Sequence, residues 1–134
     1  MKLEPSDKIY VAESTIPNAG RGVFTKRDMA NGETIEVCPV IEVPLGDTSN
    51  KKGAVLVDYF FYFCDRLAVA LGFGSIYNHS YEPNATYIKN LRNNTVEFKT
   101  IKNIKAGEEI TVNYNFGKAH DKSQPIQKNI PPAN

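Results

Sequence analysis

The sequence is poor in the features that build cross-linked, metal-stapled or membrane-spanning domains. It has 134 residues but only two cysteines, Cys38 and Cys64, and no tryptophan. Two thiols form neither a disulfide framework nor a four-thiolate zinc site, so we expect no metal and a reduced, intracellular setting. No apolar run approaches the ~20 residues of a membrane helix, and no apolar stretch follows the first residues as in a secretory signal. We therefore expect a protein that is not secreted and does not bind membranes.

An excess of either charge is also missing. Sixteen lysines and arginines stand against fifteen acidic residues, a formal net charge of +1. This balance argues against a broad basic surface, so we expect no direct binding of nucleic acid. Lys118, Lys122 and Lys128 against Asp121 nevertheless give residues 118–134 a net charge of +2. The preceding body is slightly acidic, which suits a basic or neutral partner better than a polyanion.

Short segments rich in β-forming residues predict a mostly β domain with little helix. The expected strands lie at residues 8–14, 22–25, 34–43, 86–89, 96–101 and 110–114. Pro39 and Pro44 punctuate the third segment, which we interpret as a kinked or edge strand. Residues 54–71 could contain a strand or a buried helical turn, because their periodicity does not decide. We expect one domain over residues 1–117, followed by a polar, mobile tail at 118–134.

Three short motifs hold chemistry that a β domain does not require. The Gly-Arg-Gly motif at 20–22 lets a ligand approach the main chain, although a hairpin turn alone would explain it. The Asn-His-Ser motif at 78–80, with Pro-Asn at 83–84, follows an apolar stretch. It predicts a polar loop that enters the interior, with a surface turn as the simpler alternative. The segment 107–114 ends in Tyr114, which could also be an edge-strand tyrosine packed on the core.

In this order and spacing, the motifs resemble those of the SET-domain protein-lysine methyltransferases. Residues 20–22 are similar to the family's first glycine motif, and residues 78–84 resemble its Asn-His-Ser-x-x-Pro-Asn signature. Residues 107–114 resemble its closing Gly-Glu-Glu-Leu-Thr-x-x-Tyr motif, with isoleucine in place of leucine. The resemblance covers residues 8–116, and the size is most similar to the minimal viral and bacterial members. It implies small curved β-sheets in which the segment 78–80 threads through a loop of chain to form a knot-like core.

The family transfers a methyl group from S-adenosylmethionine to the side-chain amine of a protein lysine and leaves S-adenosyl-L-homocysteine. The resemblance therefore implies a protein-lysine methyltransferase that acts on a protein or peptide, histone-like or other. Cofactor and peptide would bind on opposite faces, joined by a narrow channel. The amine must be neutral to attack the methyl carbon, and a dry aromatic channel lowers its pKa. The minimal viral members also make a homodimer an option, for which the sequence shows no interface.

The resemblance assigns roles to single residues as well. Tyr114 matches the catalytic tyrosine, whose hydroxyl would orient the amine near the sulfonium. The family's cofactor-binding positions correspond here to Gly20, Arg21, Gly22, Asn78 and His79. The first three would contribute their main chain, Asn78 its side chain to the methionine part, and His79 chiefly its backbone to the adenine. Tyr59 and Tyr87 match tyrosines of the substrate-lysine channel, with thinner flanking motifs.

The chain also departs from the family pattern. Tyr81 stands where cysteine is frequent, and Asn113 stands where aspartate is frequent. Val112 replaces a phenylalanine or tyrosine that influences how many methyl groups are added, so another residue must set that number. No cysteine-rich segment follows Tyr114, so we expect Phe116 or the tail to close the channel.

Two other functions remain open on the sequence alone. A SET-like domain could bind a peptide or the cofactor without turnover, although the signature asparagine and tyrosine are both present. A hydrolase could instead pair Cys38 or Cys64 with His79 and Asn84. Such a site needs a thiol activated beside the imidazole, and nothing in the sequence brings either cysteine there.

Overall fold

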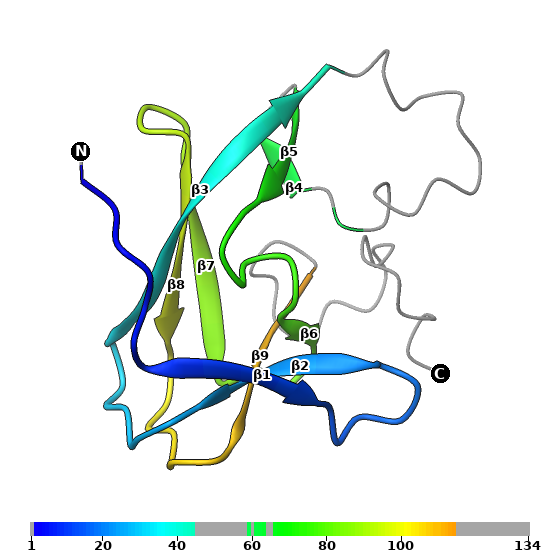
Figure 1. The fold of residues 1–134 in the computed structure, drawn as a ribbon, viewed down its shortest axis with the longest axis vertical. Helices are drawn as coiled ribbons and strands as arrows, with labels where there is room; N and C mark the ends of the chain where they lie inside the picture. Colours follow the sequence, from blue (N-terminus) through cyan, green and yellow to red (C-terminus); the bar gives the residue numbers. More distant parts are fainter. Residues whose placement is uncertain (1, 45–58, 60, 64–65, 115–134) are drawn as a thin grey trace.

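The computed structural model describes residues 2–44, 59, 61–63 and 66–114. Nine strands in this part of the chain form two small sheets with almost no helix, which confirms the mostly β prediction (Figure 1). No helix in the described part is long and apolar enough to cross a membrane. Phe116 and the expected tail at 118–134 lie outside the described residues.

The first sheet has four strands in the order β1-β2-β9-β6. These are β1 (Ile9–Glu13), β2 (Arg21–Thr25), β6 (Asn78–His79) and β9 (Glu109–Val112). β1 pairs antiparallel with β2, and Ser14 N donates to Gly20 O at 2.8 Å where the hairpin closes. Asn18 and Gly20 both have positive φ, 63° and 74°, as a tight reversal requires. The turn therefore presents residues 20–22 at the start of β2.

The second sheet has five strands in the order β4-β5-β3-β8-β7. These are β3 (Thr34–Val43), β4 (Phe61–Phe63), β5 (Arg66–Ala70), β7 (Ala85–Asn90) and β8 (Thr95–Thr100). β4 and β5 form an antiparallel hairpin. The strand alternative therefore holds for residues 61–63 and 66–70, whereas 54–58, 60 and 64–65 lie outside the described residues.

Strand β3 occupies the middle of its sheet, so the expectation of an edge strand was wrong. Its first part, through Pro39, pairs with β8, and its last part, from Val40, pairs with β5. Pro39 thus lies where the strand changes partner, and its carbonyl accepts a hydrogen bond from Leu71 N at 2.9 Å. A proline lacks only the N–H donor, so it is tolerated in a central strand at a point where the ladder switches sides.

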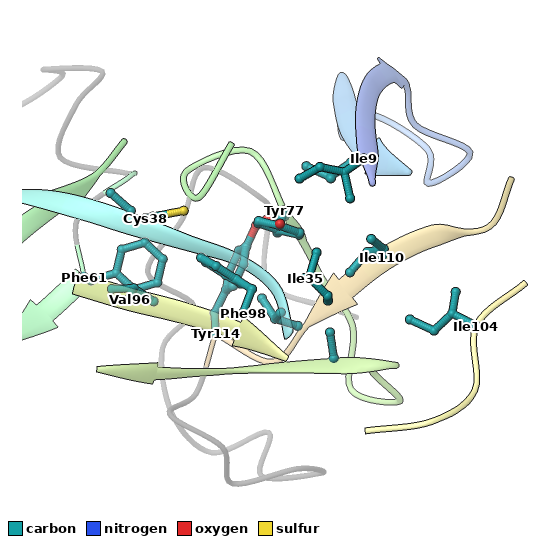
Figure 2. Close-up of a cluster of buried hydrophobic side chains, with 14 of the residues drawn as sticks. Ile9, Ile35, Cys38, Phe61, Tyr77, Val96, Phe98, Ile104, Ile110 and Tyr114 are labelled. Carbon is teal, nitrogen blue, oxygen red and sulfur yellow. The ribbon is translucent and has the colours of Figure 1, made fainter. Parts of the chain in front are cut away.

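The hydrophobic core draws side chains from both sheets and surrounds the segment that leads into β6 (Figure 2). Tyr77 is fully buried and stacks on Phe98 with ring centroids 4.2 Å apart. Its hydroxyl donates to Glu36 Oε1 at 2.8 Å, so the buried phenol is satisfied. An aromatic pair of this kind adds about 1 kcal/mol beyond the area it buries. This packing fixes the main chain just before the Asn-His-Ser motif.

Candidate active site

The pairing of β6 with β9 brings two of the three motifs together. The pairing is parallel, with Asn78 opposite Thr111 and His79 opposite Val112. Ser80 N extends it by donating to Val112 O at 2.9 Å. Asn78 and His79 are both buried, so the motif enters the interior and the surface-turn alternative is wrong.

Asn84, the last residue of the signature, links residues 78–84 to β9 by hydrogen bonds. Its Nδ2 donates to Glu109 O at 2.8 Å, and its Oδ1 accepts from Thr111 N at 2.9 Å. Because both amide atoms are bound to the main chain of β9, the side chain is not available to orient a histidine. Cys38 is fully buried in β3, and Cys64 lies outside the described residues. The structure therefore gives the hydrolase alternative no support.

The Gly-Arg-Gly motif joins the same cluster through Asn78. Asn78 Nδ2 donates to Arg21 O at 3.0 Å and to Glu109 Oε2 at 2.9 Å. A Cβ at Gly22 would collide with Glu109 Oε2 and would lie 2.9 Å from Asn78 Nδ2. Only glycine leaves room for this pair of side chains. Gly20 lies two residues earlier, in the turn, and nothing packs against the position its Cβ would take.

Glu109 is the centre of this polar cluster, a role that was not predicted from the motif. Its carboxylate accepts from the Ser14 hydroxyl at 2.8 Å and from Thr15 N at 3.3 Å, besides Asn78. The preceding Glu108 instead caps the exposed turn by accepting from Lys105 N at 3.0 Å. Successive residues of a strand face opposite sides, so the register of β9 decides which glutamate points inward. The motif alone does not reveal that register.

His79 holds the main chain of Tyr114 with its imidazole. Tyr114 N donates to His79 Nδ1 at 3.0 Å, so the neutral ring carries its proton on Nε2. That Nε2 is buried and has no hydrogen-bond partner within the described ranges. Burial lowers the pKa of His79 to about 4, which keeps the ring neutral at physiological pH. The family resemblance pointed to the backbone of His79, and this side-chain role was missed.

Tyr114 follows β9 and is almost entirely enclosed, at 4% exposed. Its hydroxyl donates to Tyr77 O at 2.5 Å. Burial raises the pKa of Tyr114, and the neighbouring Tyr59, Tyr87 and Glu109 raise it further. The group at this position is therefore a neutral hydroxyl at physiological pH and not a phenolate.

The two expected channel tyrosines lie near Tyr114. The Tyr87 hydroxyl donates to Tyr114 O at 3.4 Å, and Phe61 packs edge-on against the Tyr87 ring with centroids 5.3 Å apart. Tyr59 is half-buried and close enough to affect the pKa of Tyr114. Lys89 Nζ lies 5.9 Å from the centre of the Tyr87 ring, and burial lowers the pKa of Lys89 to about 8. The structure thus gathers all three tyrosines beside the polar cluster.

Comparisons with known proteins agree with this arrangement. A family model described as SET domain matches residues 20–115. A histone-lysine N-methyltransferase of Schizosaccharomyces pombe, described as specific for H3 lysine-37, is 32% identical over 97 residues, which are 71% of this chain and 66% of that protein. The histone-lysine N-methyltransferase SETD7 of Halocynthia roretzi is 25% identical over 127 residues, 83% of this chain and 32% of that protein.

A solved structure is similar as well. The crystal structure of a candidate histone methyltransferase of Plasmodium falciparum matches with a TM-score of 0.66 and 30% identity, and covers 83% of this chain and 96% of that chain. The present chain spans less than two thirds of the length of the two sequence relatives. The family match nevertheless takes in the three motifs and the polar cluster that they build. The chain belongs to the SET-domain family.

Proposed function

We propose that the protein transfers a methyl group from S-adenosylmethionine to the side-chain amine of a lysine in a protein substrate. The observation that carries the proposal is the neutral, buried Tyr114 hydroxyl, held 2.5 Å from Tyr77 O beside the polar cluster of β6 and β9. The SET-domain match and the histone-lysine methyltransferase relatives support it. Their names also support a histone or a similarly basic protein as the substrate.

The residues of the cluster fit the chemical groups of S-adenosylmethionine. Its ammonium group needs acceptors. Arg21 O and Glu109 Oε2 both accept from Asn78 Nδ2, so two acceptors lie together here, and the amide oxygen of Asn78 would supply another beside them. The lack of a side chain at Gly22 lets Glu109 and Asn78 lie directly against the main chain there, which holds the cluster together. The buried Nε2–H of His79 is a donor without a partner in the described part of the chain, which matches an acceptor nitrogen of a heteroaromatic base.

When bound, S-adenosylmethionine supplies an electrophilic methyl group on a sulfonium. Tyr114 cannot remove a proton from the amine, because its raised pKa keeps the hydroxyl protonated. Its hydroxyl donates to Tyr77 O, and because a hydroxyl oxygen can also accept, it would orient the amine by accepting a hydrogen bond from it. Holding the amine in line with the methyl carbon then supplies much of the rate.

The aromatic walls would prepare the amine for attack. Tyr59, Tyr87 and Phe61 surround the approach to Tyr114 with poorly solvating groups, which favours the neutral form of a lysine and releases its proton to water. Lys89 gives an internal example, since burial beside the Tyr87 ring lowers its pKa from 10.5 to about 8. A substrate lysine in the channel is expected to respond in the same direction.

The test is transfer of radiolabelled methyl from S-adenosylmethionine to core histones and to lysine-containing peptides, with Tyr114→Phe as the matched variant. We expect the wild-type protein to transfer label. Tyr114→Phe should lose at least ~100-fold in kcat, within the range that orientation of reacting groups supplies. The variant should still bind the cofactor within about twofold by calorimetry.

Three results would count against the proposal. Neither transfer nor binding heat with the wild-type protein would refute it. Binding without transfer would favour the alternative of a non-catalytic SET-like domain. Near-normal activity of Tyr114→Phe would refute the role of this tyrosine. The intracellular location and the homodimer remain predictions.

A further inference from the structure

A cavity of about 290 Å³, away from the candidate active site, opens between the N-terminal segment, β3 and the turn after β5. None of the residues gathered around β6 and β9 lines it. Its apolar walls come from Leu3, Pro5, Val37, Pro39 and Phe73. The N-terminal segment runs alongside β3, where Ser6 Oγ donates to Ile35 O at 2.8 Å (Figure 1). The cavity is therefore built from segments tied to each other, at the lower end of the size range of small-ligand sites.

Glu36 places a carboxylate at the buried end of this cavity. Only 9% of the residue is exposed. Its Oε1 accepts from the Tyr77 hydroxyl, and its Oε2 accepts from Phe73 N at 3.2 Å. A Cβ at Gly72 would lie 2.7 Å from Oε2, so this oxygen adjoins the stretch 72–73 that lines the cavity. Both partners of Glu36 are neutral donors.

No described residue pairs with the charge of this carboxylate. Among the residues that the structure describes, no lysine, arginine or histidine lines the cavity and none forms an ion pair with Glu36. Glu4 also lines the cavity, but its carboxylate is already paired with Lys2 Nζ at 3.2 Å, so Glu36 is the acid that lacks an ion pair in the described lining. Because a buried carboxylate is costly unless a positive charge or several strong donors compensate it, the cavity favours a cationic occupant. The walls would in turn cover an aliphatic stem.

We propose that this cavity binds a lysine or arginine side chain of a basic peptide segment, with the cationic head at Glu36 and the stem against the apolar walls. The volume admits one such side chain with part of its flanking backbone. The exposed Glu4 lines the cavity, so the cavity reaches the surface there and the main chain of a peptide occupant could continue outward. Charge complementarity carries the choice: among the described lining residues, a buried carboxylate without an ion pair and five apolar residues suit a basic side chain.

A single residue, Tyr77, connects the same cavity to Tyr114 by hydrogen bonds. The Tyr77 hydroxyl donates a hydrogen bond to Glu36, and the Tyr77 carbonyl accepts a hydrogen bond from the Tyr114 hydroxyl. A cation at Glu36 would change the hydrogen bond to Tyr77 and thereby bias the position of Tyr114. Peptide binding in the cavity would then alter the rate of methyl transfer. This coupling rests on the proposed function, whereas the binding itself does not.

Binding is tested by NMR titration of the whole protein, without cofactor, against three probes. The probes are the N-acetyl methylamides of arginine, lysine and uncharged norleucine. We expect the two charged probes to shift the backbone amides of Val37, Gly72 and Phe73, with norleucine at least tenfold weaker. Glu36→Gln should weaken the arginine probe at least tenfold, and Val37→Phe, which fills the cavity, should abolish its binding.

Glu97→Gln is the matched control, since Glu97 is a β8 carboxylate that accepts from the Thr34 hydroxyl outside the cavity. It should bind the arginine probe as the wild-type protein does. Equal affinity for norleucine and arginine would overturn the proposal. So would shifts confined to residues 87–89, which would place the probe in the lysine channel. Full binding by Val37→Phe would refute the location even if Glu36→Gln failed to fold.

The coupling has its own readout. Saturating arginine probe is expected to change kcat for methyl transfer at least twofold in the wild-type protein and to leave Val37→Phe unaffected. An unchanged kcat with bound probe would overturn the coupling and leave the binding result standing. A protein that binds the probes but transfers no methyl group would refute the proposed function alone.

Discussion

Replacing Glu109 by glutamine should weaken the binding of S-adenosylmethionine about tenfold. The Glu109 carboxylate accepts from Ser14, from Thr15 and from Asn78 Nδ2 at 2.9 Å, and so fixes the amide that we propose binds the cofactor. Glutamine keeps the shape but replaces one acceptor oxygen by a donor. The glutamine side chain has a single, neutral acceptor oxygen. This oxygen can accept either from Asn78 or from Ser14 and Thr15, but it cannot replace both carboxylate oxygens.

The size of the effect follows from that exchange. A hydrogen bond to a charged acceptor contributes about 1.5–3 kcal/mol, against about 0.5–1.5 kcal/mol for a neutral one. The difference of about 1.4 kcal/mol corresponds to a tenfold change in Kd. The same hydrogen bonds also stabilise the folded protein without cofactor, so the free energy of unfolding is expected to drop by about 1 kcal/mol in a separate measurement.

Calorimetric titration with S-adenosylmethionine measures the change in Kd, and urea unfolding measures the change in stability. Glu108→Gln is the matched control, because Glu108 caps the exposed turn at Lys105 on the other side of the strand. It should bind the cofactor within twofold of the wild-type protein. Equal affinities of the two variants would refute the reasoning, since they would show that the inward carboxylate does not position Asn78.

Three further predictions concern neighbouring side chains. Tyr87→Phe should increase the number of methyl groups added per lysine, because the lost hydroxyl frees space beside Tyr114; mass spectrometry of a peptide product measures this, and an unchanged distribution would argue against the role. Asn84→Ala should lower the free energy of unfolding by about 2–4 kcal/mol, since two hydrogen bonds to β9 disappear and leave its main chain unsatisfied; Asn90→Ala, on an exposed turn, should cost less than about 1 kcal/mol in the same urea assay. His79 has its pKa lowered from 6.5 to about 4, so the unfolded chain binds its proton first and stability should fall as the pH drops from 6.5 towards 4. His79→Gln should remove that part of the fall, and an identical pH profile would contradict the burial argument.

Most strands were predictable because short β-rich segments bounded by glycine, proline and asparagine follow local rules. β1, β2, β7, β8 and β9 agree with the predicted segments to within a few residues. The central place of β3 was not predictable, since the effect of Pro39 depends on which strand lies on each side at that residue. Nor was β6 predictable as a strand, because two residues carry no periodic pattern and pair only with a distant segment.

The candidate site was also predictable only in part: its motif residues were predictable, whereas the roles that depend on long-range contacts were not. The motifs themselves identified Asn78, His79 and Tyr114, since their spacing is specific. The roles of Glu109, Glu36 and the His79 imidazole depend on long-range contacts between buried polar atoms. Such contacts are fixed by strand register and core packing, which a single sequence does not specify.

The parallel pairing of β6 with β9 also has a consequence for the order of events in folding. Asn78 and His79 precede their partners Thr111 and Val112 by more than thirty positions, and the five-stranded sheet contributes β7 and β8 in between. The polar cluster therefore cannot assemble on a nascent chain until synthesis has passed Tyr114. Contacts of such long range form slowly, so acquisition of cofactor binding should be a late step that reports completion of the whole described core.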